Sequence, residues 1–220
     1  MKITVLGAGA WGTAIAVSLS ARHDVVLWGR DPGQCRAIAA AGRNQRYLPE
    51  IELPPQLTIE AEFAAAIASA ELVLVATPTV ALRDMLVRLA PRKKPVMWLC
   101  KGFEPQSAEL PHQIAAEVLA PGNACGVMSG PSFALEVARG LPTALTLASA
   151  DAGFSRATAR ALHGPRLRVY FSTDIAGVEI GGAVKNVMAI ATGIADGLGL
   201  GANARAALIT RGLAEITRLG

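Results

Sequence analysis

Lys185 is the residue whose surroundings most favour a chemical role. It lies in segment 181–190, which reads GGAVKNVMAI and is otherwise built from small and apolar residues typical of a packed helix. Burying a lysine is costly unless the ammonium is paired or its pKa is shifted, so a solitary buried cation marks a functional site more often than packing. The alternative is a lysine whose stem crosses apolar surface while its ammonium reaches water. We predict that Lys185 is catalytic.

Two further segments place polar groups where a substrate could lie. Lys101 follows a predicted strand at 95–99, where a lysine could polarise a carbonyl, hold a phosphate or simply keep the surface soluble. Ser132 follows a predicted strand at 124–128 and could either cap the next helix or offer hydrogen-bond donors to a substrate. The residues alone leave these alternatives open.

The strongest motif is a glycine-rich turn at the start of the chain. Residues 7–12 read GAGAWG, directly after the apolar run 2–6 and before a small, apolar helical segment at 13–20. In a strand–turn–helix unit, such a G-x-G-x-x-G turn binds the pyrophosphate of a dinucleotide at the helix N-terminus. Its three glycines allow the tight turn, the approach of the pyrophosphate and the close packing of helix on strand. The predicted cofactor-binding residues of this turn are Gly7, Gly9, Ala10, Trp11 and Gly12.

The residue after the second predicted strand bears on cofactor choice. Arg30 follows the run 25–28, at a position where an acidic residue usually holds the ribose of NAD and an arginine suits the 2′-phosphate of NADP. Asp31 is adjacent and blurs this distinction, and Arg30 could also be a solvated cation at a strand end. The sequence predicts NADP or NAD as the cofactor, with NADP slightly favoured.

The elements that must position these residues alternate between strand and helix, which predicts βαβ units. The fold class is therefore α/β, with a Rossmann-type, mostly parallel sheet covered by helices on both faces. A Pro-rich loop is expected over 48–57. The predicted strands are 2–6, 25–28, 72–75, 95–99, 124–128, 143–148 and 167–171, and the helices between them include 34–41, 61–69, 80–89, 109–119 and 152–162.

The character of the chain changes near residue 172. Beyond it there is no strand signal, only small-residue helical sequence with two predicted helices at about 175–195 and 203–219. We therefore predict a dinucleotide-binding domain over 1–172 and the incomplete beginning of an all-helical domain over 173–220. Two helices have too little core to stand alone, so they are expected to pack on a partner or on further sequence, and a homodimer is predicted.

The composition limits the partners. The chain is 52% hydrophobic and 17% charged with a net charge of +4, and a low charged fraction fits strands buried on both faces. Its Lys and Arg residues are scattered, with no basic run that carries aromatics, so nucleic acid is not expected. Attraction of a phosphorylated small molecule is the more suitable interpretation of the positive charge.

Cysteine usage and hydropathy indicate the compartment. The three cysteines have no metal-type spacing and suit a reducing, cytoplasmic setting. The first residues imitate a secretory signal, but glycines suit its apolar helix poorly and cleavage would destroy the turn. Lys185, Asn186 and Asp196 interrupt the longest apolar run, so no membrane span is expected. The three histidines are expected at the surface or at helix ends, and no spacing indicates a metal or a serine hydrolase.

Taken in order, these motifs resemble the bacterial form of the NAD(P)-dependent glycerol-3-phosphate dehydrogenase family. The resemblance covers essentially the whole chain, and its later motifs are more specific than a general Rossmann fingerprint. The matching segments are 7–14 (GAGAWGTA), 101–102 (KG), 130–134 (GPSFA), 181–186 (GGAVKN), 196–201 (DGLGLG) and 208–213 (LITRGL).

The resemblance implies a Rossmann-type domain followed by an all-helical substrate domain. It implies reversible hydride transfer between NAD(P)H and dihydroxyacetone phosphate, giving sn-glycerol 3-phosphate for phospholipid synthesis. Trp11, Arg30 and Lys101 would contact the cofactor and Ala134 would line it. Lys185 would be the proton donor and acceptor, with Lys101 as a second catalytic cation. The substrate-binding residues would be Lys101, Gly130, Ser132, Lys185 and Asn186.

The sequence also departs from the family. Members continue through further helical sequence with Gly-Leu-Gly-Asp and Ser-Arg-Asn segments that contribute to phosphate and cofactor binding, and neither segment occurs here. The expectation is a fragment, an artificially shortened chain or a naturally shortened gene product. Two other functions remain open: another β-hydroxyacid or 6-phosphogluconate type dehydrogenase, or a non-catalytic nucleotide-binding module.

Overall fold

The computed structural model describes residues 1–219, and its core is an eight-stranded sheet in the order β10-β9-β8-β7-β6-β1-β2-β5. Neighbouring strands pair in parallel except β8 and β9, which are antiparallel. The Rossmann-type, mostly parallel sheet predicted from the sequence is thereby confirmed. The strands are β1 (Lys2–Leu6), β2 (Asp24–Trp28), β5 (Thr58–Glu60), β6 (Leu72–Val75), β7 (Val96–Trp98), β8 (Cys125–Ser129), β9 (Thr143–Ala148) and β10 (Leu167–Ser172).

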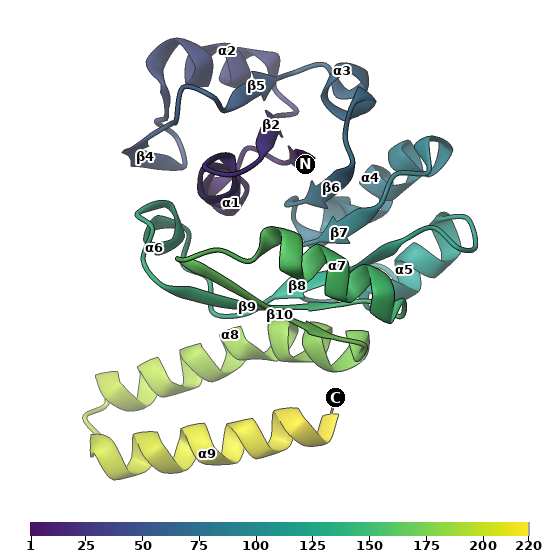
Figure 1. Cartoon of the computed structure of the whole chain (residues 1–220). Coiled ribbons are helices and arrows are strands. Elements are labelled where there is room, and N and C mark those ends of the chain that lie inside the picture. The colour runs from purple at the N-terminus through teal and green to yellow at the C-terminus, as the bar shows by residue number, and fades with distance from the viewer. Residues whose placement is uncertain (220) are drawn as a thin grey trace.

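Helices cover both faces of this sheet (Figure 1). One apolar core includes residues of α1, α2 and α7, and the other includes residues of α3, α4, α5 and the start of α8. The helices are α1 (Ala10–Ser20), α2 (Pro32–Ala41), α3 (Phe63–Ala68), α4 (Leu82–Leu89), α5 (Pro111–Val118), α6 (Ala134–Ala138), α7 (Ala152–Leu162), α8 (Ile175–Gly197) and α9 (Gly201–Leu219). Two short 3₁₀ turns, η1 (Thr79–Ala81) and η2 (Ala90–Arg92), flank α4.

Strand β6 shows why the apolar runs form the centre of the sheet. Successive side chains of a strand point to opposite faces. Leu72 and Leu74 accordingly enter one core, while Val73 and Val75 enter the other, and all four are buried. A run without polar residues is therefore what a strand with helices on both faces requires.

The segment predicted as a Pro-rich loop at 48–57 is not entirely a loop. It begins with β4 (Leu48–Glu52), which pairs antiparallel with the two-residue strand β3 (Arg43–Asn44). Leu48 and Ile51 are buried in a small apolar cluster with residues of α1 and α6. The prolines do not prevent this pairing, because proline is tolerated in short edge strands.

After Ser172 the chain forms two helices that lie side by side and project from the sheet (Figure 1). The helices pack closely at Gly212, where a Cβ atom would lie 1.9 Å from Cε of Met188. The start of α8 packs on the sheet, whereas Val187, Ile190 and Ile194 on its later turns are exposed. We keep the division at residue 172 as a proposal based on this change of architecture.

Helix α8 differs from the expectation that no apolar run reaches spanning length. Within residues 1–219 it is the one helix long and apolar enough to cross a membrane by length and composition alone. Lys185, Asn186 and Asp196 do interrupt it, but helices of water-soluble proteins can have the same composition. The contact of its first turns with the sheet fits a helix of a folded domain.

Candidate active site

The glycine turn lies between β1 and α1, next to the strand order reversal at β1 and β6. Gly7 has a φ of +121°, which an L side chain rarely adopts, and its N–H donates to the carbonyl of Trp28 at 2.9 Å. A Cβ atom on Gly12 would lie 1.9 Å from the carbonyl oxygen of Gly7. A Cβ atom on Gly9 would meet nothing within 4 Å. The turn therefore requires glycine at two positions for folding and leaves the third open towards a ligand.

The structure around this opening fits the pyrophosphate of a dinucleotide. Gly9 is the N-cap residue of α1, and no side chain caps the helix. The N–H groups of the first turn and the positive end of the helix dipole can therefore serve an anion. Thr77, at the carboxyl end of β6, has a buried hydroxyl without a hydrogen-bond partner in the described part of the chain.

The structure separates the roles of Arg30 and Asp31 after β2. The Asp31 carboxylate accepts from the N–H of Gly33 at 2.8 Å and caps α2, whereas Arg30 is exposed. Asp31 is thus engaged in the helix cap, and it lines a cavity of about 340 Å³ together with Arg43 and Arg46. An arginine-lined space at this end of β2 suits a 2′-phosphate.

A second cavity, of about 490 Å³, separates the end of β8 from α8. The predicted site residues Gly130, Lys185 and Asn186 line it. Lys185 is half-buried, because α8 is not surrounded by other elements at this level and its side chains Val187, Ile190 and Ile194 are exposed. Lys185 is therefore not the fully buried cation predicted from the sequence, and its place in the cavity wall is the observation that supports a catalytic role.

Lys101 and Lys185 converge on one carbonyl at the edge of this cavity. Lys185 Nζ lies 3.3 Å and Lys101 Nζ 3.5 Å from the oxygen of Gly130, both long contacts. Lys101 Nζ also donates to Ser132 Oγ at 3.1 Å, and Ser132 Oγ donates to Gly130 at 3.2 Å. Ser132 therefore does not cap α6, whose N-cap residue is Phe133. The segments that follow β7 and β8 therefore meet α8 here.

The paired lysines give the cavity a positive charge. Within residues 1–219 neither lysine has a carboxylate partner in an ion pair. Burial first, and the Lys185 ammonium second, lower the pKa of Lys101 to about 8. Like charges in a partly buried site disfavour each other, so a bound anion would relieve both. The site is suited to a phosphorylated ligand.

Trp11 connects the glycine turn to the lysine cavity. Lys101 Nζ lies 5.9 Å from the centre of the Trp11 ring, and Trp11 and Ala134 both pack on the same apolar cluster. Thr79 Oγ1 donates to the carbonyl of Lys101 at 2.9 Å and fixes the backbone there. The two sites predicted separately from the sequence are therefore adjacent.

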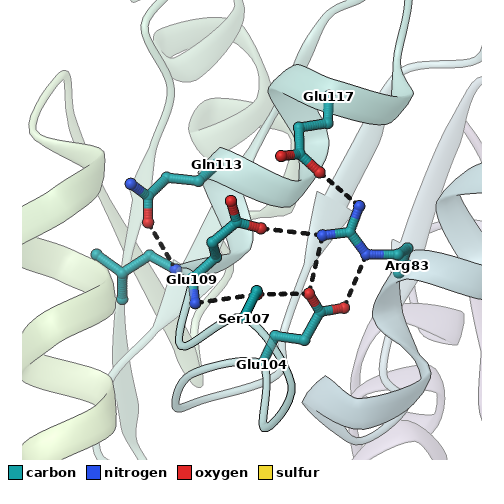
Figure 2. A network of polar contacts seen from close by, with 7 residues as sticks. Arg83, Glu104, Ser107, Glu109, Gln113 and Glu117 are labelled. Carbon is teal, nitrogen blue, oxygen red and sulfur yellow. Dashed lines mark hydrogen bonds and ion pairs between the residues drawn. The ribbon is translucent and has the colours of Figure 1, made fainter.

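The loop after Lys101 is held by a charge network that the sequence did not reveal (Figure 2). Arg83 on α4 contacts the carboxylates of Glu104, Glu109 and Glu117, and Ser107 donates to Glu104 at 2.7 Å. Arg83 first and Ser107 second lower the pKa of Glu104 to about 2. The network joins this loop to α4 and α5.

Ser129 is a site residue that the sequence analysis missed. It is 5% exposed and lines the cavity, and its hydroxyl has no hydrogen-bond partner among residues 1–219. A Cβ atom on Gly182 would lie 2.7 Å from this oxygen, so the glycine allows α8 to approach. A buried hydroxyl without a partner suits a ligand contact. The only sequence signal was its place beside Gly130.

Comparisons with known proteins agree with this geometry. A family model described as the NAD-dependent glycerol-3-phosphate dehydrogenase N-terminus matches residues 2–155, and the corresponding C-terminus model matches residues 174–220. Glycerol-3-phosphate dehydrogenase [NAD(P)+] of Leptothrix cholodnii is 60% identical, over all of this chain and 68% of the relative. The same-named protein of Aromatoleum aromaticum is 57% identical, over all of this chain and 67% of the relative.

Solved structures give the same answer. The crystal structure of glycerol-3-phosphate dehydrogenase from Coxiella burnetii superposes with a TM-score of 0.89 at 43% identity, over 99% of this chain and 68% of that one. The chain thus spans about two thirds of the length of the relatives it matches. The matched motifs, the fold and the relatives together show that the chain belongs to the NAD-dependent glycerol-3-phosphate dehydrogenase family.

Proposed function

We propose that this chain supplies the cofactor site and the catalytic lysines for reversible, NAD(P)H-dependent reduction of dihydroxyacetone phosphate to sn-glycerol 3-phosphate. The observation that carries the proposal is the convergence of Lys101 and Lys185 on the Gly130 carbonyl, beside the glycine turn. The family relatives carry the name of this activity. In the cell the product would feed glycerophospholipid synthesis.

The two lysines would divide the chemistry at the ketone. The hydride comes from a reduced nicotinamide when the cofactor is bound, and its addition to a ketone leaves an alkoxide. The Lys185 ammonium would donate a proton to that oxygen and take one back in the oxidative direction. Lys101 would stabilise the developing negative charge. Gly130, Ser132 and Asn186 would hold the substrate at the cavity wall.

The glycine turn and the end of β2 would hold the cofactor. Gly7, Gly9, Ala10, Trp11 and Gly12 form the turn and the first turn of α1, and Ala134 packs beside them. Because Asp31 is engaged in capping α2, exposed Arg30 is the better placed of the two to meet a 2′-phosphate. This supports NADP as the favoured cofactor.

A non-catalytic nucleotide-binding module is the second candidate. It is favoured by the exposed apolar side chains Val187, Ile190 and Ile194 on α8. The same surface supports a homodimer, which sedimentation over a concentration series would detect. A cytoplasmic location fits the three free thiols, and cell fractionation would check it.

Substrate choice tests the proposal. The purified chain should oxidise NADPH with dihydroxyacetone phosphate, and it should not reduce NADP+ with 3-hydroxy acids or 6-phosphogluconate. NADPH fluorescence should report binding in the same sample. Turnover of a hydroxy acid instead would favour the wider dehydrogenase group, and binding without turnover on any substrate would favour the module.

A further inference from the structure

A buried carboxylate joins the two elements that carry the lysines. Glu179 on α8 is 4% exposed, and both of its oxygens have partners. Oε1 accepts from Nε1 of Trp98 at 2.7 Å, and Oε2 lies 2.6 Å from Nδ1 of His112. Trp98 ends β7, three residues before Lys101, and Glu179 precedes Lys185 by six residues on α8.

In the part of the chain that the structure describes, the bond from Trp98 to Glu179 is the one side-chain hydrogen bond between α8 and a strand of the sheet. The remaining side-chain hydrogen bond from α8 to the sheet region is the long one from Lys185 to the Gly130 carbonyl. Ile175 and Val178 add apolar packing but do not fix a register, because such contacts are not directional. Glu179 is thus the directional link between α8 and β7.

Burying a carboxylate is costly, which argues against a purely structural purpose. Burial raises the pKa of Glu179, while its bonds to His112 and Trp98 act in the opposite direction. Well-packed apolar residues often replace buried charged groups at no cost in stability, whereas buried polar groups can fix one arrangement among several. The arrangement that Glu179 fixes is the position of α8 relative to the end of β7.

We propose that Glu179 is a positioning residue that sets the separation of the Lys101 and Lys185 ammonium groups by joining α8 to Trp98 and His112. Its catalytic meaning depends on the proposed function, whereas its effect on the two lysines does not. Without this link, α8 would move away from β7 and Lys185 would act less strongly on Lys101. The bonds to Trp98 and His112 come from two different elements, so they fix α8 along two directions.

The experiment measures the reactivity of Lys101 in the full chain, without cofactor or turnover. The chain is acetylated at a series of pH values, and mass spectrometry of the peptide that contains Lys101 measures the extent of labelling. Only the neutral amine reacts, so labelling follows the deprotonation of Lys101. In the native chain the labelling midpoint should lie near pH 8. Glu179→Ala should move it upward, and a midpoint near 9 would slow labelling at pH 8 by about fivefold. Glu179→Gln should give a smaller rise, since it keeps an acceptor for Trp98.

Three further variants separate positioning from general loosening of the fold. In the Lys185→Met background Glu179→Ala should have little added effect, because Glu179 acts through Lys185. Trp98→Phe removes one bond and should reproduce part of the rise if Glu179→Ala does not fold. Glu71→Gln changes an exposed carboxylate that accepts from the N–H of Lys2; it is the matched control and should leave the midpoint unchanged.

Labelling midpoints of Glu179→Gln and of Trp98→Phe that both stay at the native value would overturn the proposal. The proposal would also be overturned if Glu179→Ala raised the Lys101 labelling midpoint as much in the Lys185→Met background as in the native chain. That result would mean that the substitution loosens the fold around Lys101. Because acetylation needs no substrate, a chain that fails to reduce dihydroxyacetone phosphate would still give a clear answer.

Discussion

Gly9 and Gly12 occupy the same turn but should fail for different reasons when they are replaced by alanine. At Gly12 the new Cβ would lie 1.9 Å from the Gly7 carbonyl oxygen, whereas at Gly9 it would meet nothing within 4 Å. Gly12→Ala must therefore displace α1 from β1. Gly9→Ala folds normally, because its φ of −81° and ψ of −176° suit any residue.

The expected magnitudes differ accordingly. Overpacking of this severity costs about 3 kcal/mol, partly offset by the higher helix propensity of alanine, of about 1 kcal/mol. A net loss of about 2 kcal/mol lowers Tm by roughly 4–8 °C in a chain of this size. Gly9→Ala should change the unfolding free energy by less than about 1 kcal/mol, since loss of N-cap preference and loss of unfolded-state entropy oppose each other.

Thermal unfolding and NADPH titration of both variants check this reasoning. Gly9→Ala should keep the native Tm and lose at least about tenfold in NADPH affinity, because its methyl group occupies the space where the pyrophosphate must approach. Gly12→Ala should lose both stability and affinity. Gly9→Ala that binds NADPH as tightly as the native chain would refute the assignment of this turn.

Three other substitutions test the site. Lys101→Met should be more stable than the native chain at neutral pH. The pKa of Lys101 is lowered from 10.5 to about 8, so the unfolded native chain binds more protons between these values. The unfolding free energy of the native chain therefore rises with pH across that window, and the difference between the variant and the native chain shrinks. Urea unfolding midpoints at several pH values would show this. Ser129→Ala should weaken binding of dihydroxyacetone phosphate without loss of stability, because the buried hydroxyl has no partner in the described chain; calorimetry would measure the affinity. Glu104→Gln should destabilise the chain above pH 4.5, and the difference should vanish as acid unfolding approaches pH 2, because Arg83 holds the pKa of Glu104 low.

The local patterns of the sequence predicted the fold because each apolar run is a strand buried on both faces. Strand β6 and the turn at Gly7 could each be predicted from four to six adjacent residues, without reference to the rest of the chain. β5 was missed because its three residues, Thr58–Glu60, form no apolar run and gain strand structure only by pairing with β2. Short edge strands depend on their neighbours rather than on their own sequence.

The site was predicted less completely, because its parts come from distant segments. Sequence motifs indicated Lys101, Gly130, Ser132 and Lys185 as candidate site residues. They did not indicate that both lysines contact the Gly130 carbonyl oxygen. His112 was expected at the surface or at a helix end, and it does lie in the first turn of α5. Its contact with the Glu179 carboxylate, 67 positions away, is one that no local pattern reports.

In the proposed reaction on dihydroxyacetone phosphate, Lys185 moves the proton. The most direct measurement is the absorbance decay of NADPH with dihydroxyacetone phosphate at high protein concentration, for the native chain and for Lys185→Ala. We expect NADPH decay in the native chain and at least about a hundredfold slower decay in the variant, with NADPH binding retained. Equal rates in the two proteins, or no decay in the native chain while NADPH is bound, would contradict the proposed reaction.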